Sequence, residues 1–595
     1  MRKHKVKNIG PICDHNEEII THDLEKTEYF NDFFVNVSKD LTKQLDPLNL
    51  SSINTFITRV TPTRDKTDMS WELVKNKLTK TANPKKATGP DQVSPRVLSM
   101  IGDPVIHSLL PIFRKSICDA SFPSSWKLSR VNPIFKKGSP TEANNYRPIS
   151  LLSIPGKILE DVVSDTLNNH LHTQGLLSHR QWGFRKNYST ESLLLHLTET
   201  WKNALDKGLK VGVLFIDFRK AFDTVNHTIL LEKLKAIGIS GDLHSWLTDY
   251  MSARKQFVQI SGYQSEHKTI THGVPQGSIL GPKLFSIFVN DLPESITSGE
   301  LFMFADDTTI FTIGNNIDDI ILTLQSVLDQ LYTWCQSNRL IANESKSEAL
   351  IISSQNFIGP LPRLAFGNSF IEYKTSSKCL GVTIDSKLSW QEHIKNVCKS
   401  FSNKVAVLNR IKFLPIPTLE NIYYKTIIPS VLYGIVVWGS CSSTLMDDID
   451  RIHLRATRII YNLPHSIHSD DIMNAPHWNS IVSFYIRRLL VITYNIYHGN
   501  SIEPLNDLIV KSETPYDLRK SLKVKVHRPR TEMGRSSFKH RAALSWNLLP
   551  EDIKNSSNLT SFKRKLRENK RILKSISFAK ASCSISYKSV DFKYF

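Results

Sequence analysis

The strongest constraint on the fold of this chain is the stretch from Leu301 to Phe311, which reads LFMFADDTTIF. Apolar and β-branched residues on both sides of two adjacent carboxylates predict a strand, a tight turn and a second strand. Such a hairpin holds Asp306 and Asp307 close together, where their charges repel unless a cation lies between them. An ordinary turn is the alternative, because aspartate is common where a chain reverses.

A third carboxylate follows another apolar run. Residues Val211 to Ile216 read VGVLFI and are followed directly by Asp217. The next residues, Phe218 to Asp223, predict the start of a helix. A carboxylate at the end of a neighbouring strand would complete a site for two divalent metal ions, so we expect the three aspartates to lie together.

The length and charge of the chain limit its organisation and its partners. At 595 residues it is too long for a single core and should divide into three or four units. Lysine and arginine number 76 against 56 acidic residues, which gives a net charge of +20 and favours a polyanionic partner. Ribosome-like binding or binding to a membrane surface would explain the charge equally well.

The cysteines and the apolar runs argue against zinc and membrane. The seven cysteines are scattered, with no C-x-x-C pair, so we expect reduced thiols in an intracellular protein and no zinc site. The longest apolar run, Val431 to Trp438, is too short to cross a bilayer. The basic start Met1 to Lys7 lacks the apolar stretch of a signal peptide. This basic start is either a nuclear localisation signal or a frayed terminus.

Two further regions could contact a nucleotide. Val131 to Phe135 predicts a strand, the basic turn Lys136-Lys137-Gly138 follows, and Arg147 precedes a second strand. These cations suit a triphosphate, with plain surface charge as the alternative. The loop Trp182 to Arg185 is aromatic and basic and could stack on a nucleotide.

Glycine and proline mark a loop between the first aspartate and the hairpin. Residues Thr271 to Pro282 read THGVPQGSILGP, and three glycines there let the backbone approach a ligand closely. Further along, Cys379 to Asp385 predicts a strand of another hairpin.

The C-terminal third is helical and basic. From 390 to 500 the pattern is helical almost throughout, with Arg451, Arg455 and Arg458 on one helical face. A solvated face is the default interpretation, although a duplex backbone would fit it. The tail from Leu518 to Lys574 predicts a small helical nucleic-acid-binding module with a flexible end after about 576. Its candidate contacts are Arg519, Lys523, Arg528 and Arg530.

Taken in order, these elements resemble the palm of a reverse transcriptase. Four motifs resemble those of non-LTR retrotransposons of the jockey type: YRPISL at 146–151, KAFD at 220–223, GVPQGS at 273–278 and FADDT at 304–308. The Ala-Asp-Asp core differs from the Gly-Asp-Asp usual in RNA-dependent RNA polymerases. The resemblance covers nearly the whole chain, since WNLLP at 546–550 and the basic tail also look like the end of such elements.

The resemblance implies an α+β fold shaped as a right hand. We expect fingers, a palm with an antiparallel sheet, and a thumb, followed by a mostly helical basic C-terminal region. The expected boundaries are an N-terminal helical extension at 1–75, a reverse transcriptase domain at 117–385, a thumb-like region at 386–500 and a basic module at 501–595. Within the domain the fingers run to about 205, with a lead-in from about 80, and the palm covers 206–385.

The resemblance also implies an activity. An RNA-directed DNA polymerase adds deoxynucleotides to a primer 3′ hydroxyl by two-metal phosphoryl transfer. Two Mg²⁺ ions are expected, for which Mn²⁺ could substitute. Asp217 and Asp306 would bridge both metals, Asp307 would support one, and the Phe218 carbonyl would complete a coordination shell.

Other roles follow by position in the family's motifs. Phe222 matches the steric gate against a ribose 2′ hydroxyl, and Gln276 and Gly277 match the loop that supports the templating base and the nucleotide. Lys346 matches the lysine that protonates pyrophosphate, although Ser345-Lys346-Ser347 departs from the commoner Lys-Thr. Lys136, Lys137 and Arg147 would bind the nucleotide, and Leu380 and Gly381 match the primer grip.

The implied partners are an RNA template, a DNA primer or target and deoxynucleoside triphosphates, with no membrane. We expect nuclear action, with a cytoplasmic RNA–protein complex also open, and no N-terminal endonuclease domain. Two alternatives stay open at this point. One is a catalytically idle nucleic-acid-binding remnant of a mobile element. The other is a palm-fold nucleotide cyclase, which the fingers hairpin and the Gln276 loop disfavour.

Overall fold

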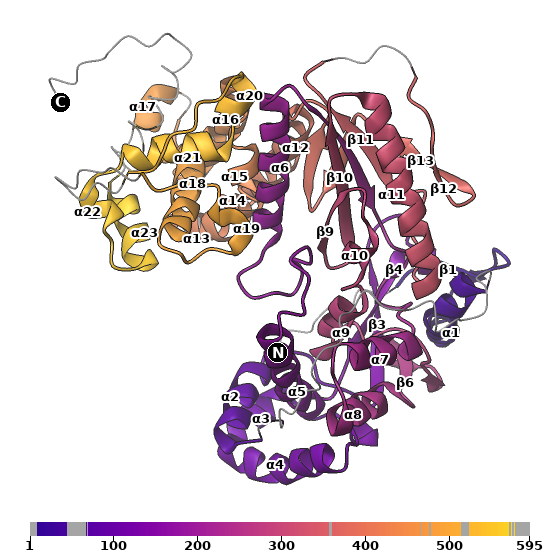
Figure 1. The fold of residues 1–595 in the computed structure, drawn as a ribbon. Coiled ribbons are helices and arrows are strands. Elements are labelled where there is room, and N and C mark those ends of the chain that lie inside the picture. The colour runs from indigo at the N-terminus through magenta and orange to yellow at the C-terminus, as the bar shows by residue number, and fades with distance from the viewer. Residues whose placement is uncertain are drawn as a thin grey trace.

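The computed structural model describes residues 9–43, 67, 69–355, 360–464, 466–474, 478–512, 523–569, 573 and 576. The basic start, Arg519 and the expected flexible end therefore lie outside the described residues. Two larger sheets, the two-stranded sheets β1-β2 (Ile12–Cys13 and Ile19–Ile20) and β14-β15 (Ser376–Cys379 and Val382–Asp385), and several helical layers build the described part of the chain (Figure 1), which confirms the predicted α+β class.

A six-stranded sheet, here called the palm sheet, forms the centre of the molecule. Alternate residues of its strand β5 enter different cores: Val211, Val213 and Phe215 pack toward α6 (Thr190–Asp206), whereas Leu214 and Ile216 pack toward α11 (Ile317–Asn338). Because strand side chains alternate between faces, a run without polar residues is buried on both sides. In sheet order the strands are β12 (Leu364–Phe366), β13 (Ser369–Tyr373), β11 (Glu348–Ile352), β5 (Lys210–Ile216), β10 (Asp307–Gly314) and β9 (Glu300–Phe304).

A second sheet and its helices, here called the fingers, lie below the palm sheet in Figure 1. The predicted hairpin is present, with β3 antiparallel to β4 and parallel to β6. The strands are β4 (Tyr146–Leu151), β3 (Leu128–Phe135), β6 (Lys255–Ile260), β7 (Tyr263–Gln264) and β8 (Lys268–Thr269). The helices are α2 (Trp71–Thr81), α3 (Pro95–Ile101), α4 (Asp103–Cys118), α5 (Ile154–Thr173), α7 (His227–Ala236), α8 (Gly241–Met251), α9 (Leu280–Phe288) and α10 (Leu292–Ser295).

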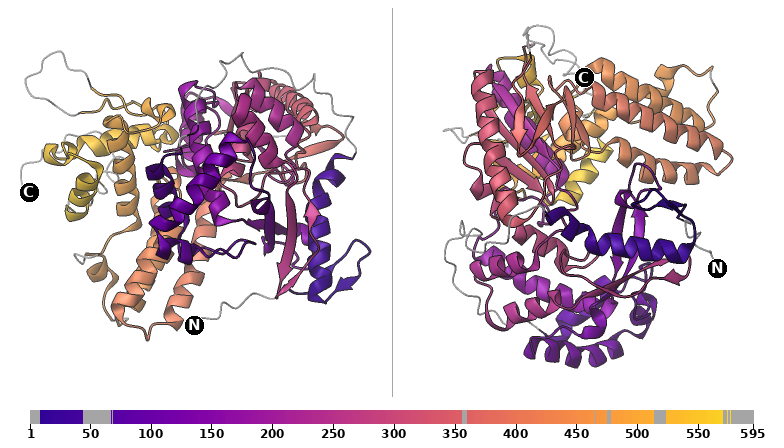
Figure 2. Two further views of the ribbon diagram at one scale, coloured as in Figure 1. Left: turned by 90° about the horizontal axis from the view of Figure 1, so that it is seen from below. Right: turned by 90° about the vertical axis from the view of Figure 1, so that its right-hand side faces the viewer.

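The helices after the palm sheet form a bundle, here called the thumb. A short hairpin of β14 (Ser376–Cys379) and β15 (Val382–Asp385) leads into it. The right-hand view of Figure 2 shows the orange thumb helices extending away from the sheet, with the fingers below. The thumb helices are α12 (Gln391–Arg410), α13 (Ile416–Ile422), α14 (Ile428–Val431), α15 (Ile435–Trp438) and α16 (Ser443–Ile460).

The C-terminal region shares its hydrophobic core with the thumb and one face of the palm sheet. Trp546 and Phe562 belong to the same buried cluster as Trp201 of α6 and Trp438 of the thumb. Figure 1 accordingly shows the yellow helices beside the orange ones and α6. The helices here are α17 (Ser469–Asn474), α18 (Ile481–Tyr497), α19 (Glu503–Asn506), α20 (Glu532–Arg535), α21 (Phe538–Asn547), α22 (Glu551–Lys554) and α23 (Leu559–Glu568).

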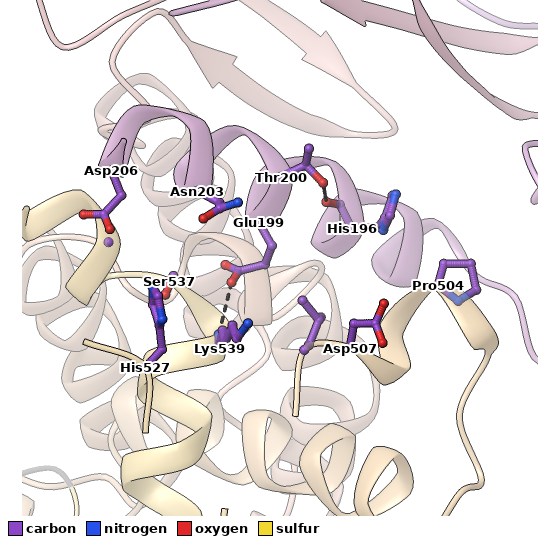
Figure 3. Close-up of a pocket in the computed structure, with 12 residues that line it drawn as sticks. His196, Glu199, Thr200, Asn203, Asp206, Pro504, Asp507, His527, Ser537 and Lys539 are labelled. Atoms are coloured by element: carbon purple, nitrogen blue, oxygen red, sulfur yellow. Dashed lines mark hydrogen bonds between the residues drawn. The ribbon is translucent and has the colours of Figure 1, made fainter. Parts of the chain in front are cut away.

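Two carboxylates of α6 hold the N-terminal ends of C-terminal helices. Asp206 Oδ1 accepts hydrogen bonds from the backbone nitrogens of Arg530 (3.0 Å) and Thr531 (2.7 Å), just before α20. Glu199 accepts the backbone N–H groups of Phe538 (2.6 Å) and Lys539 (3.0 Å), at the start of α21. Carboxylates suit these positions because the first N–H groups of a helix lack partners and carry positive charge. A cavity of about 270 Å³ lies between α6 and this region (Figure 3).

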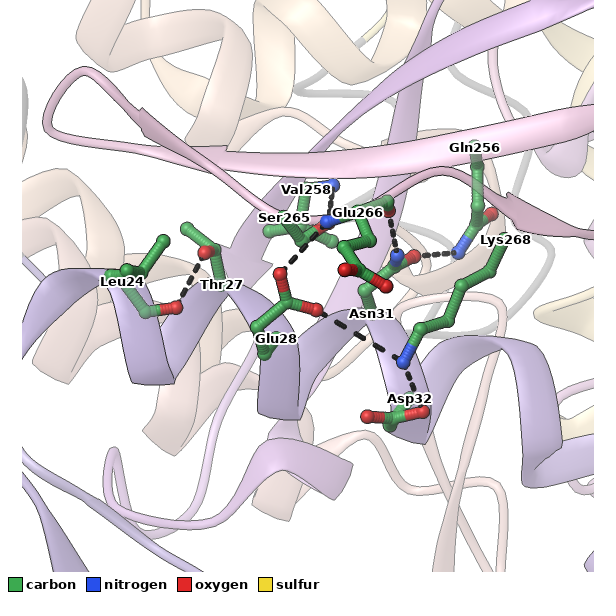
Figure 4. A network of polar contacts seen from close by, with 10 residues as sticks. All are labelled: Leu24, Thr27, Glu28, Asn31, Asp32, Gln256, Val258, Ser265, Glu266 and Lys268. Carbon is green, nitrogen blue, oxygen red and sulfur yellow. Dashed lines mark hydrogen bonds and ion pairs between the residues drawn. The ribbon is translucent and has the colours of Figure 1, made fainter.

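The N-terminal helix α1 (Asp23–Thr42) packs on the fingers sheet. Asn31 donates to the Glu266 carbonyl at 2.8 Å and accepts from Gln256 at 3.1 Å, while Lys268 pairs with Asp32 (Figure 4). On its apolar side, Phe30 contacts the Tyr146 ring of β4 edge-on at 5.0 Å. The helix is therefore attached by polar and apolar contacts to strands far along the chain.

Across the described ranges, no single helix combines the length and apolar composition needed to cross a membrane. The bent pair α3 and α4 does so only when both helices are counted together.

Candidate active site

The hairpin of β9 and β10 carries two of the predicted carboxylates. Phe304 pairs with Asp307 across the ladder, so Ala305 and Asp306 form a two-residue turn. Ala305 has a φ of 60°, as hairpin turns of the primed types require at their first central residue. The predicted strand, turn and strand are confirmed, and Asp306 lies at the tip.

A buried glutamine in a neighbouring loop fixes this turn. Gln181 Oε1 accepts hydrogen bonds from the backbone nitrogens of Gly183 (2.8 Å) and Ala305 (3.2 Å). A β-carbon on Gly183 would lie 2.4 Å from the Ala305 nitrogen, so only glycine permits this approach. Trp182 is fully buried, which makes the stacking prediction wrong for this residue. The exposed aromatic residue of the loop is Phe184.

The third aspartate follows β5 and lies at the same end of the palm sheet. Thr308 pairs with Ile216, which brings the start of β10 beside Asp217. The Asp217 carbonyl accepts from the Asn343 backbone nitrogen at 2.7 Å, and its carboxylate accepts from Asn343 Nδ2 at 3.3 Å. Lys346 Nζ lies 4.0 Å from the same carboxylate. The predicted residue Lys346 is thus a neighbour of the carboxylates.

The three carboxylates repel one another. Burial, together with the charges of Asp306 and then Asp217, raises the pKa of Asp307 to about 6. The pKa of Asp306 is also raised, first by burial and then by Asp217, while Lys136 and Arg147 oppose the shift. Asp307 keeps contact with solvent, but the protein atoms around it disfavour its charge. A bound cation would relieve this repulsion and keep the carboxylates ionised.

The donor atoms suit a divalent metal ion in their chemistry. Carboxylate and carbonyl oxygens are the ligands that Mg²⁺ and Mn²⁺ prefer. Phe218 and Ala342 lie opposite each other in an antiparallel bridge. The hydrogen bonds of this bridge are made by the residues on either side of the pair, so the Phe218 carbonyl points away from Ala342. Within the described part of the chain, however, no three His, Cys, Asp or Glu side chains gather closely enough to hold a metal ion.

A pocket of about 530 Å³ opens beside the carboxylates. The predicted residues Leu380 and Gly381 line it from the turn between β14 and β15, and Lys136 lines it from the fingers. The sequence did not single out Thr190, Lys378 or Tyr433, which also line it.

The fingers hairpin directs positive charge toward this pocket. The pKa of Lys136 is lowered by burial and then by Arg147, whereas Asp217 opposes the shift, so both groups act on Lys136. The Lys136 backbone nitrogen donates to the Asn145 carbonyl at 2.9 Å, which closes the hairpin. Lys137 is exposed in the turn and adds a further positive charge beside Lys136.

The residues after Asp217 form turns, and the predicted helix start at Phe218 is wrong. Lys220 has a φ of 49°, and α7 begins only at His227. Within this segment Phe222 stacks on Phe285 at 4.3 Å between ring centroids.

The glycine-rich loop lies against both the turn segment and the fingers sheet. Gln276 Nε2 donates to Asp223 Oδ1 at 2.8 Å, and burial raises the pKa of Asp223 to about 6. The Gln276 carbonyl accepts from the Ser150 backbone nitrogen at 2.8 Å, so Gly277 follows a residue fixed on β4. Asp223 ends the KAFD motif at 220–223, but no role could be predicted for it from the sequence, because its partner lies in another loop.

The basic residues predicted to bind nucleic acid differ in their surroundings. Arg451 is exposed and paired with Asp448, and Arg455 is exposed. Arg458 donates to the carbonyls of Pro464 (2.9 Å) and Ile467 (2.8 Å), so its guanidinium holds a loop of its own chain. Arg519 lies outside the described residues. Lys523, Arg528 and Arg530 are exposed on the segment that precedes α20.

Comparison with known proteins identifies one family. The family model described as reverse transcriptase (RNA-dependent DNA polymerase) matches residues 134–384. The RNA-directed DNA polymerase from mobile element jockey of Drosophila melanogaster is 30% identical over 420 residues, which are 68% of this chain and 45% of that protein. The probable RNA-directed DNA polymerase from transposon X-element of the same species is 25% identical over 478 residues, 77% of this chain and 51% of that protein.

The chain thus spans about half the length of these two relatives. Among solved structures, an apo telomerase from Candida tropicalis truncated from its C-terminal domain matches 44% of this chain and 54% of its own at 16% identity. Its TM-score is 0.31, which is too low to support an argument.

Proposed function

This chain carries a reverse transcriptase domain of the jockey, non-LTR type, and from that premise we propose that it is an RNA-directed DNA polymerase. In this proposal it adds deoxynucleotides to a primer 3′ hydroxyl on an RNA template. The observation that carries the proposal is the strand register, in which Thr308 pairs with Ile216 and Asp307 with Phe304, so that Asp217, Asp306 and Asp307 lie at one end of the palm sheet. Repulsion among carboxylates placed in this way favours a bound cation.

We propose that this cation is Mg²⁺, with two ions per site and Mn²⁺ as a substitute. Asp217, Asp306, Asp307 and the Phe218 carbonyl would hold it. When bound, such ions activate the attacking hydroxyl and neutralise charge on the leaving group.

The chain's own side chains would orient the substrates. Lys136 and Arg147 would bind the triphosphate, since lysine acts as a point charge and arginine can bind two oxygens at once. Lys346, 4.0 Å from Asp217, is a proton donor candidate for the leaving pyrophosphate. Gln276, anchored on Asp223, would support the base pair from the side of the glycine-rich loop.

The partners in this proposal are an RNA template, a DNA primer or target and deoxynucleoside triphosphates, with action in the nucleus. The division into fingers, palm, thumb and basic C-terminal region belongs to the same proposal.

Extension of oligo-dT on poly-rA, with and without Mg²⁺, tests the activity. We expect extension that requires the metal ion. The variant Asp306→Asn should lose incorporation by at least about a thousandfold, comparable to the loss of a principal electrostatic group, while circular dichroism shows an intact fold.

The matched control is Asp242→Asn, an exposed aspartate in the first turn of α8. It should extend the primer at the wild-type rate. Full activity of Asp306→Asn would refute the site. Nucleic-acid binding without extension by the wild-type chain would favour an idle remnant.

A further inference from the structure

A tyrosine of the thumb holds the turn that faces the carboxylates. Tyr433 follows α14 and precedes α15 in the chain, and its hydroxyl donates to the Leu380 carbonyl at 2.7 Å. It also lies 2.9 Å from the Thr190 hydroxyl at the start of α6. A carbonyl only accepts and a tyrosine has one proton, so Thr190 supplies the proton of the second bond. Three regions of the chain thus meet at one hydroxyl.

The turn itself is in a conformation that needs support. Cys379 pairs with Val382, so Leu380 and Gly381 are the two residues of the turn. Both have positive φ, 45° for Leu380 and 89° for Gly381. A leucine with positive φ is disfavoured because its β-carbon crowds the backbone, and it persists where neighbouring groups fix it. The Tyr433 ring also packs closely on Gly381, where a β-carbon would lie 3.0 Å from the ring.

This contact lies beside the proposed chemistry. Tyr433, Thr190, Leu380 and Gly381 line the same pocket as Asp306 and Asp307. The position of the turn therefore determines the shape of the pocket opposite the carboxylates.

We propose that Tyr433 is a positioning residue: by holding the Leu380–Gly381 turn, its hydroxyl aligns the primer end with the carboxylates. This inference rests on the proposed polymerase function. The contact predicts an effect on the rate of nucleotide addition and little effect on binding, because the hydroxyl acts on the geometry of the pocket.

The test is Tyr433→Phe, which keeps the ring and removes the hydroxyl. In single-turnover extension we expect the maximal rate constant to fall about fivefold, as for one lost hydrogen bond. The apparent dissociation constants for deoxynucleotide and for primer–template should change less than about twofold. Thr190→Val should act in the same direction, and its effect should not add to that of Tyr433→Phe because both act through one contact.

The matched control is Tyr461→Phe, which removes a thumb hydroxyl bonded to Glu420. This variant should extend at the wild-type rate. A fall of similar size in Tyr461→Phe, or no fall in Tyr433→Phe, would overturn the positioning role.

Hydrogen exchange in the free protein tests the contact without any substrate. The amides of residues 379 to 382 should exchange faster in Tyr433→Phe than in the wild type and in Tyr461→Phe. Equal exchange in the three proteins would show that the Tyr433 hydroxyl does not hold the Leu380–Gly381 turn. If the three proteins differ in exchange as expected but the wild-type chain never extends a primer, the proposed function is refuted, and the aligning role of Tyr433 with it.

Discussion

The ring of Phe222 packs between other aromatic side chains, which restrict its movement. It stacks on Phe285 at 4.3 Å and meets Phe184 edge-on at 6.2 Å. In the role of steric gate, the Phe222 ring would face the sugar of the incoming nucleotide, and a ribose 2′ hydroxyl would collide with it. We predict that Phe222→Ala lowers discrimination against ribonucleotides by about 10- to 100-fold, the usual range for rejection of one small group.

Primer extension with each deoxynucleotide and its ribonucleotide measures this ratio. Phe370→Ala, an exposed phenylalanine of β13, is the control and should leave the ratio unchanged. An unchanged sugar preference in Phe222→Ala would remove the role of steric gate.

Single residues could be predicted where they follow a strand. Asp217, Asp306 and Asp307 stand directly after apolar runs, and the structure brings them to one end of the sheet. Gln181 and Tyr433 could not be predicted, because each acts through one hydrogen bond to a distant backbone atom. Nothing in their local sequence distinguishes them from other polar or aromatic residues.

Among the thumb helices, α16 carries a histidine that is buried in its neutral form. His453 Nε2 lies 3.0 Å from the Asn479 carbonyl, and Nδ1 contacts the Tyr423 hydroxyl. Burial lowers the pKa of His453 to about 4, against an ordinary value of about 6.5. Between these values the unfolded chain binds more protons than the folded one, so stability is lost as pH falls through this window.

We predict that the wild type loses about 2 kcal/mol more than His453→Gln when the pH is lowered from 7 to 5. Urea unfolding of both proteins at the two pH values measures the difference. Asp450 on the same helix has its pKa raised to about 6, which acts in the opposite sense, but it is present in both proteins. His468→Gln, an exposed histidine, should behave as the wild type. An equal loss in His453→Gln would contradict the prediction.

Strands were predictable and turns less so. The apolar runs before Asp217 and around Asp306 form strands because a sheet buried on both faces requires such runs. The predicted helix from Phe218 was wrong. The predicted hairpin at Cys379 to Asp385 is present and β15 is its strand, but Leu380 and Gly381 form the turn and do not belong to the strand. Both differences occur at a residue with positive φ, Lys220 and Leu380. Neither lysine nor leucine signals that conformation, whereas Asn-Gly or Gly-Gly would have done so.

At the scale of the whole molecule, the C-terminal region is attached through α6. We predict that Asp206→Ala destabilises the protein by about 2 kcal/mol, near the upper end for loss of a helix cap, because two N–H groups and the Thr531 hydroxyl lose their acceptor. Thermal unfolding and the rate of trypsin cleavage within 523–569 measure the effect, with Asp242→Ala as the control. Unchanged cleavage would show that Asp206 does not hold this region.

The order of motifs was enough to predict the α+β fold. The shared core of the thumb and C-terminal region was not predictable, because basic residues dominate the tail and suggest a separate module. Its few large apolar residues, such as Trp546 and Phe562, are nevertheless fully buried against the rest of the molecule. Two carboxylates on α6 then decide where the region docks.

The attachment of α1 to the fingers sheet has a consequence for synthesis on the ribosome. Asn31 and its partner Glu266 are 235 residues apart in the chain. At elongation rates of about 5 to 20 residues per second, roughly 10 to 50 seconds pass between the translation of the helix and that of Glu266. Strands β3 and β4 are translated earlier, but until β6 follows, Phe30 and Phe34 lack Val258 and Ile260 of their apolar cluster. The nascent chain therefore exposes apolar surface of this helix, which molecular chaperones can bind.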